Sequence, residues 1–105
     1  LLDEAIPAAL PFNHGVLVRV PRPGRYALHK LIVARQRAAH EAAKARKDVH
    51  QAAALLGALE GVMPWEIDDA AQALARRPSS WRKAATEGAA LLPDPLRARV
   101  LGLWG

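Results

Sequence analysis

The sequence predicts a mainly α-helical protein with a short β element near its N-terminus. One β-branched run, residues 15–20, lies between turn-forming residues early in the chain. After that run, apolar residues recur at helical spacing and are interrupted by glycine and proline. Alanine is frequent, and it favours helix while burying little surface per side chain. These three observations predict helices packed through leucine, valine and alanine.

The composition is that of a folded domain. The chain has 105 residues, of which 51% are hydrophobic and 24% charged, and a formal net charge of +5. This length suits one small domain or a piece of a larger one. The absence of cysteine excludes a disulfide scaffold, a thiolate zinc site and a cysteine nucleophile. No apolar run approaches the roughly 20 residues that cross a bilayer. We therefore expect no membrane partner and a cytoplasmic location.

The N-terminal segment predicts one good strand and a weaker one. Residues 15–20 form the good strand, and residues 8–10 form an edge strand or an extended stretch between two prolines. A lone strand cannot satisfy its own hydrogen-bonding groups. The chain also begins without methionine. We therefore expect residues 1–24 to be a β element that continues a sheet formed by an upstream half of the same polypeptide.

The remaining residues predict two long helices and a helical tail. The first helix, residues 25–38, has Leu28, Leu31 and Ile32 on one face, which predicts its buried side. The second helix, residues 40–59, carries an alanine-rich stripe and ends near glycines and a proline. We expect residues 25–60 to form a helical pair.

Residues 61–105 form the predicted helical tail. A helix at 65–77 begins acidic and ends basic, as the helix dipole favours. A helix at 81–91 follows, with Ser79 or Ser80 as its N-cap, and a short helix ends near Gly102. We expect the three tryptophans to anchor helix packing rather than to stack on bases. They are Trp65, Trp81 and Trp104.

Positive charge is concentrated in the first half of the chain. Residues 19–47 contain nine basic residues and one acidic residue, Glu41, whereas from residue 58 onward six basic and six acidic residues balance. Such a surplus suits the phosphates of a nucleotide or a nucleic acid. A solvated helix face is the alternative explanation.

Helical spacing brings a lysine and an aspartate toward one seam. Lys30 lies opposite the buried face of the first helix and shares its side with Tyr26, Val33 and Arg37. Asp48 lies at the margin of the apolar stripe of the second helix. If the two helices pair antiparallel, Lys30 and Asp48 approach each other. A lysine, an aspartate and flanking arginines at such a seam can hold a phosphate.

The same second helix allows a simpler explanation. Lys44 and Asp48 are four residues apart, and with Gln51 they form one ridge. An i,i+4 ion pair on a solvated face contributes only about 0.3–0.5 kcal/mol. The spacing alone leaves both interpretations open.

Two motifs resemble a bacterial nucleotidyltransferase-fold family. Residues 20–31 resemble its V-P-x-P-x-R-[FY]-A-x-H-K-L segment, and residues 44–52 resemble its K-x-x-K-D-x-x-Q-A segment. The resemblance covers roughly residues 1–60, and residues 61–105 resemble the variable helical tail of the family. It implies that this chain is the C-terminal helical part of an α/β nucleotidyltransferase-type protein.

The resemblance also implies roles for individual residues. Lys30 would contact the phosphates of a nucleoside triphosphate, and Asp48 would lie beside it, so that these two residues form the catalytic pair. Arg25, Arg46 and Lys47 would bind phosphate together with Lys30. The implied reaction is nucleotidyl transfer from the triphosphate to an acceptor that the sequence does not identify, with RNA and protein among the candidates.

The chain departs from the family in one respect. The superfamily binds two metal ions through a D-x-D pair that follows a G-S turn, and this sequence has neither. Nucleotidyl transfer needs such carboxylates to hold the metal. We therefore expect Mg²⁺ to be bound by residues outside this chain, and the chain alone to be inactive. The four histidines lack the H-E-x-x-H spacing, so no metal site is expected among them.

Two other functions remain open. A non-catalytic, basic helical module that binds nucleic acid would use the same cluster of positive charge. A structural helical domain would leave those charges merely solvated.

Overall fold

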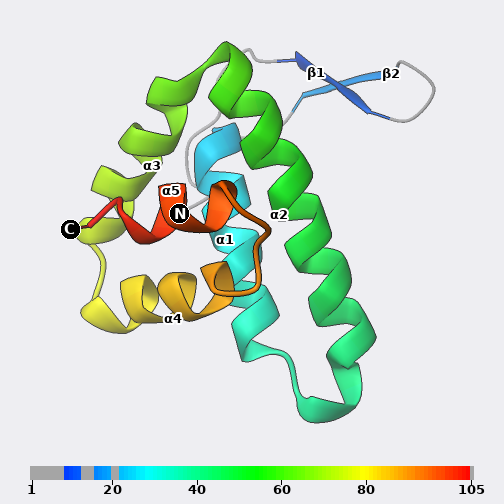
Figure 1. Ribbon diagram of the computed structural model, residues 1–105, viewed down its shortest axis with the longest axis vertical. Helices are drawn as coiled ribbons and strands as arrows, with labels where there is room; N and C mark the ends of the chain where they lie inside the picture. Colours follow the sequence, from blue (N-terminus) through cyan, green and yellow to red (C-terminus); the bar gives the residue numbers. More distant parts are fainter. Residues whose placement is uncertain (1–8, 13–15, 20–21, 105) are drawn as a thin grey trace.

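The computed structural model describes residues 9–12, 16–19 and 22–104. The architecture is mainly helical, as predicted, with a two-stranded hairpin before the helices (Figure 1). The longest helix follows a short 3-10 turn at Ala39–Glu41. In chain order the elements are β1 (Ala9–Phe12), β2 (Val16–Arg19), α1 (Pro23–Gln36), α2 (Ala42–Val62), α3 (Pro64–Ala75), α4 (Ser79–Ala89) and α5 (Leu96–Leu101).

Strands β1 and β2 pair with each other in antiparallel register. Ala9 lies opposite Arg19, and Phe12 lies opposite Val16. The strand at residues 16–19 thus has one partner within the described chain, which pairs one of its two edges. The ends of the strand predicted at 15–20 lie outside the described residues, as does residue 8. Continuation of an upstream sheet by residues 1–24 stays a prediction.

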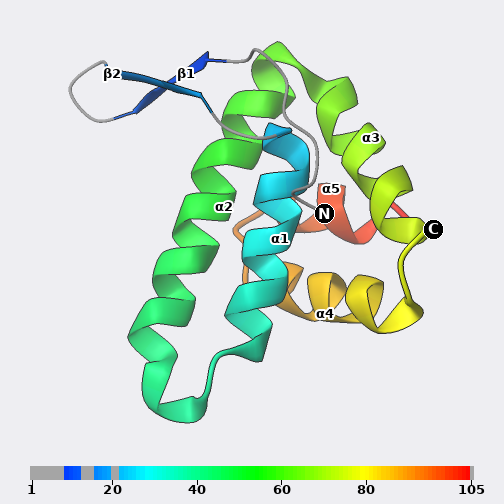
Figure 2. The same ribbon diagram turned by 180° about the vertical axis from the view of Figure 1, so that it is seen from behind.

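Helix α1 lies at the centre of the helical bundle. It packs against α2, α3 and α4, which surround it in Figures 1 and 2. Pro23 is the first residue of α1, where its missing N–H costs nothing. Leu28, Leu31 and Ile32 are buried, so the predicted inner face is confirmed. The opposite side of α1, which carries Lys30, meets α2.

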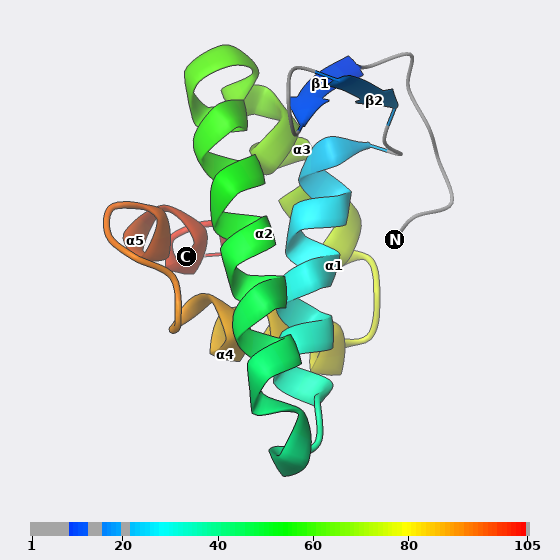
Figure 3. The same cartoon turned by 90° about the vertical axis from the view of Figure 1, so that its right-hand side faces the viewer.

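Helices α1 and α2 run antiparallel and are joined by residues 37–41 (Figure 3). Val49, Ala52 and Leu56 of α2 are buried in the same core as α1. Gly57 and Gly61 do not end the helix early, because α2 continues to Val62. Among the helices that the structure describes, none is long and apolar enough to cross a membrane.

Two glycines, one in α1 and one in α4, allow neighbouring helices to lie close to the backbone of α1. A β carbon on Gly24 would overlap the carbonyl of Glu66 in α3. A β carbon on Gly88 of α4 would overlap the carbonyl of Leu31 in α1. Glycine is therefore the residue that lets α3 and α4 lie against the central helix at this separation.

Arg99 fastens the short helix α5 to the rest of the bundle. Its guanidinium donates hydrogen bonds to Glu60 Oε2 in α2 at 2.7 Å and to Asp68 Oδ1 in α3 at 3.0 Å. A third bond goes to the carbonyl of Pro64. The hydrogen bonds to Asp68 and Glu60 raise the pKa of Arg99. One side chain thus connects three helices.

Two predictions about the tail are wrong in detail. Neither Ser79 nor Ser80 caps α4, because Pro78 occupies the N-cap position and Ser79 is already the first helical residue. Trp65 does not anchor packing, since it is 57% exposed at the start of α3. Trp81 and Trp104 do pack against the core, as predicted.

Candidate functional site

Lys30 and Asp48 meet across the seam between α1 and α2. The Lys30 Nζ lies 3.5 Å from Asp48 Oδ1. This contact follows from the antiparallel pairing of the helices, which turns the outer side of α1 toward the margin of the apolar stripe on α2. The predicted approach of the two side chains is therefore observed.

Arg37 completes this contact and was not among the predicted site residues. Its Nε donates a 2.9 Å hydrogen bond to Asp48 Oδ2, the oxygen that Lys30 does not face. This bond raises the pKa of Arg37, and nearby Glu41 adds to the effect. The signal was present in the sequence, because Arg37 lies seven residues after Lys30 and hence on the same helical side.

Asp48 is the buried member of the group. Only 3% of the residue is exposed, whereas the side chains of Lys30 and Arg37 remain 24% and 29% exposed. A buried carboxylate is strongly unfavourable unless it is paired and hydrogen-bonded. Here each carboxylate oxygen faces one cation. Asp48 is thus compensated from both sides, and the two cations still reach solvent.

A shallow hollow of about 300 Å³ opens above these side chains. The positively charged members of its wall come from both helices and outnumber Asp48, the one carboxylate in the lining. Such a cluster attracts anions, and its several N–H groups can hold phosphate oxygens. The lining consists of Lys30, Arg37, Lys44, Lys47, Asp48 and Gln51.

Two neighbouring contacts shape the hollow. Lys44 pairs with Glu41 Oε2 at 3.5 Å, so it does not form the i,i+4 ion pair with Asp48 that the simpler explanation requires. The Lys30 ammonium also lies 5.5 Å from the centre of the Tyr26 ring, within the range of a cation–π contact. Tyr26 and Asp48 together fix the direction of Lys30.

The predicted phosphate-binding residues are only partly brought together. Lys30 and Lys47 line the hollow, but Arg25 and Arg46 are not among its lining residues. Arg46 is exposed and lies two residues before Asp48, which places it on the far side of α2. Arg25 is half-buried in the first turn of α1.

The described residues do not fit a divalent metal site. Within residues 9–12, 16–19 and 22–104, no group of three histidine, cysteine, aspartate or glutamate side chains lies close enough to hold a metal ion. Asp48, the carboxylate in the hollow, is already shared by Lys30 and Arg37. No step of the chemistry is therefore assigned to a metal held by these residues.

Comparison with known proteins adds one finding to this geometry. Residues 1–76 match a protein-family profile described as Nucleotidyltransferase. This range includes the hairpin, the helix pair and the hollow, and it ends after α3. No curated protein and no solved structure shows significant similarity to the chain.

Proposed function

Because this chain belongs to a nucleotidyltransferase family, we propose that its hollow between α1 and α2 binds the phosphates of a nucleoside triphosphate. The observation that supports this most directly is the joining of Lys30 and Arg37 through Asp48. Two cations are held at a fixed separation beside open solvent, which is the arrangement that a polyphosphate needs. Lys47 and Lys44 extend the positive wall along α2.

In this proposal Lys30 is the residue that contacts phosphate. Its distance of 3.5 Å to Asp48 is longer than the 2.9 Å bond of Arg37, so the ammonium is held less tightly. An incoming phosphate oxygen can therefore take up N–H donors of Lys30 with little loss at Asp48. Arg37 can offer the phosphate its remaining guanidinium donors.

Asp48 acts as a positioning residue in this proposal. It is almost completely buried, and its two oxygens are engaged by cations. Its role is to keep Lys30 and Arg37 pointed toward the same hollow while the site is empty. Preorganised charges of this kind need not reorganise when the ligand arrives.

The proposed reaction is the transfer of a nucleoside monophosphate to the hydroxyl of an acceptor, with RNA and protein as the candidates. The oxygen of an acceptor hydroxyl attacks the α-phosphorus and releases its proton to solvent, the bond from that phosphorus to the bridging oxygen breaks, and pyrophosphate leaves. Cations around the phosphates stabilise the charge that develops on the leaving group. We propose that the carboxylates that hold Mg²⁺ come from outside this sequence, so the chain by itself binds nucleotide without transferring it.

Titration of the 105-residue chain with ATP and, separately, with inorganic tripolyphosphate tests this proposal by calorimetry. Lys30→Gln removes one charge-assisted contact and should weaken tripolyphosphate binding about 10- to 100-fold. Urea unfolding of the same variant checks that the fold is retained. Absence of measurable binding by the unaltered chain, or an unchanged Kd in Lys30→Gln, would overturn the proposal.

The adjacent residues Lys47 and Arg46 provide a matched pair of variants. Both are exposed cations on α2, but only Lys47 lines the hollow. Lys47→Gln should weaken tripolyphosphate binding more than Arg46→Gln does, although both lose one positive charge. Equal losses would instead favour diffuse attraction by the whole basic surface, as expected for a module that binds nucleic acid without catalysis.

A further inference from the structure

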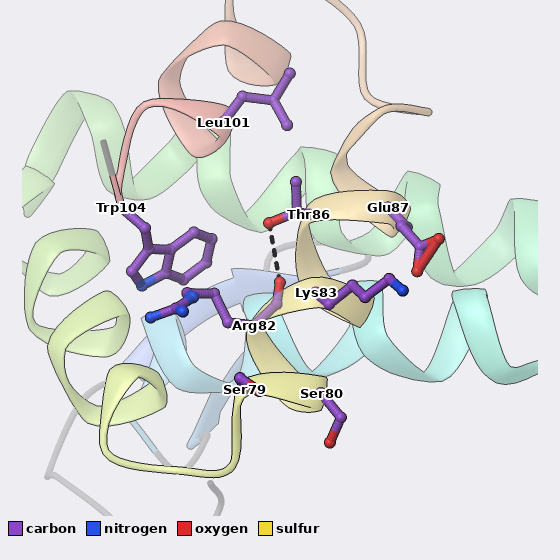
Figure 4. Close-up of a pocket in the computed structure, with 8 residues that line it drawn as sticks. All are labelled: Ser79, Ser80, Arg82, Lys83, Thr86, Glu87, Leu101 and Trp104. Atoms are coloured by element: carbon purple, nitrogen blue, oxygen red, sulfur yellow. Dashed lines mark hydrogen bonds between the residues drawn. The ribbon is translucent and has the colours of Figure 1, made fainter.

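A second hollow lies beside α4, beyond the residues that match the family. It encloses about 530 Å³ (Figure 4). Helix α4 and the C-terminal segment after α5 both contribute to its wall. The side chains that matter here are Ser79, Ser80, Arg82, Lys83, Leu101 and Trp104.

The acidic residues of the tail form their ion pairs with arginines outside this hollow. From residue 58 onward each of the six acidic side chains pairs with an arginine that is not part of the hollow. Within the described part of the chain no ion pair joins Arg82 or Lys83 to an acidic residue, although Glu87 lines the same hollow one helical turn after Lys83. The pairs are Glu60 and Asp68 with Arg99, Glu66 and Asp69 with Arg22, Glu87 with Arg35, and Asp94 with Arg97.

Other polar groups of the wall are already engaged. The Thr86 hydroxyl donates a 2.9 Å hydrogen bond to the carbonyl of Arg82, which Figure 4 marks. Glu87 lines the hollow too, but its Oε1 lies 3.4 Å from Arg35 Nε. The polar side chains of the wall without such a contact are Arg82, Lys83, Ser79 and Ser80, and two positive charges face the one negative charge of Glu87.

An aromatic wall faces these groups. The indole Nε1 of Trp104 donates a 3.0 Å hydrogen bond to the carbonyl of Ala71, which fixes the ring against α3. Leu101 stands beside it and is 41% exposed. A fixed, flat apolar surface next to unneutralised cations is the combination on which single-stranded nucleic acids bind, with bases on the ring and phosphates on the cations.

We propose that this hollow binds a segment of single-stranded nucleic acid, with Arg82 and Lys83 on its phosphates and a base against Trp104. The aromatic wall distinguishes this ligand from an acidic peptide, for which charge alone would suffice. The proposal concerns binding at α4 and does not require that the hollow between α1 and α2 transfer nucleotides.

Fluorescence anisotropy with a labelled 20-nucleotide single strand tests the proposal on the 105-residue chain. The double variant Arg82→Gln/Lys83→Gln should raise the Kd on the order of tenfold or more at 0.1 M salt. It should also reduce the slope of log Kd against log salt concentration by about 1.4, the value for two phosphate contacts on a single strand. Arg46→Glu changes the net charge by the same amount on the far side of α2 and should leave the Kd within about twofold.

The aromatic contact has its own test. Trp104→Leu should weaken binding of the normal strand but not of an abasic strand of equal length, because only the former has bases to stack. Urea unfolding shows whether each variant keeps its fold, and ATP titration reports separately on the first hollow. Three results would each overturn the proposal. The first is an equal loss of affinity in the double variant and in Arg46→Glu. The second is competition by polyglutamate that equals competition by the unlabelled strand, and the third is no binding by the unaltered chain.

Discussion

Arg37 Nε and Asp48 Oδ2 lie 2.9 Å apart across the seam between α1 and α2. This bond joins the end of one helix to the buried side of the next, close to the connection between them. It also leaves the second carboxylate oxygen to face Lys30. The charge pattern of the hollow therefore depends on one buried carboxylate.

Asp48→Asn tests how much this carboxylate contributes to stability. The substitution leaves Lys30 and Arg37 without their shared anion and replaces one acceptor by an amide. We expect the free energy of unfolding to fall by about 1–3 kcal/mol, the cost of a disrupted buried hydrogen-bonding group. Urea unfolding followed by circular dichroism measures it.

Asp94→Asn is the control for that measurement. Asp94 pairs with Arg97 on the surface, and its side chain is more than half exposed. Exposed ion pairs contribute little, so this variant should change stability by no more than about 0.5 kcal/mol. A similar loss in both variants would show that Asp48 is not specially compensated.

Two glycines should respond to alanine in opposite directions. Gly88→Ala places a methyl group against the carbonyl of Leu31 and should lower the free energy of unfolding by about 1–3 kcal/mol through overpacking. Gly57 faces open space within α2, so Gly57→Ala should raise it by about 0.5–1 kcal/mol through helix propensity. Thermal unfolding of the two variants side by side measures both, and a stable Gly88→Ala would contradict the close approach.

His29 should make stability depend on pH near neutrality. Burial lowers its pKa below the ordinary value of 6.5, and the charge of Lys30 adds to the effect. The unfolded chain therefore takes up a proton at a higher pH than the folded chain does. The stabilisation is fully present above pH 6.5 and is lost as the pH falls from there through the pKa of the folded state.

His29→Gln should remove this part of the pH dependence. Urea unfolding between pH 7.5 and 5.5 measures the slope, in a range above the titration of most carboxylates. An NMR titration of the His29 ring should give a midpoint below 6.5. A His29 midpoint at or above 6.5 would contradict this account.

Arg99→Gln should loosen the C-terminal helix more than the rest of the bundle. The variant loses the hydrogen bonds to Glu60 and Asp68, and we expect a cost of about 1 kcal/mol at this partly exposed position. Hydrogen exchange should accelerate first in α5. Arg97→Gln, which loses one surface pair, should leave that exchange nearly unchanged.

The helices and the meeting of Lys30 with Asp48 were predictable because periodicity defines the faces of a helix. Leu28 and Leu31 marked the buried side, and their position directed Lys30 toward the neighbouring helix. The resemblance predicted a nucleotidyltransferase family, and residues 1–76 match the profile of one. Each of these predictions depends on the spacing of residues along the chain, which can be read directly from the sequence.

Other features depended on contacts between distant residues. Helical spacing places Arg37 on the same side as Lys30, but nothing local shows that it reaches Asp48 rather than solvent, because that contact joins two helices. Ser79 was expected to cap α4, but Pro78 has the extended backbone that the position before the helix needs, with φ −52° and ψ 145°. Trp65 lies in the first turn of α3 and is exposed, and nothing in its local sequence distinguishes it from the two tryptophans that pack against the core.

The close contact of Gly88 with Leu31 has a consequence for engineering. Leu31 directly follows Lys30, so α4 touches the backbone of α1 next to the residue that carries the ammonium. A chimera that receives its C-terminal helices from another protein would inherit the placement of Lys30 from the donor segment. Such a graft can preserve the geometry of residues 1–76 only if it presents a residue without a side chain at that point of contact.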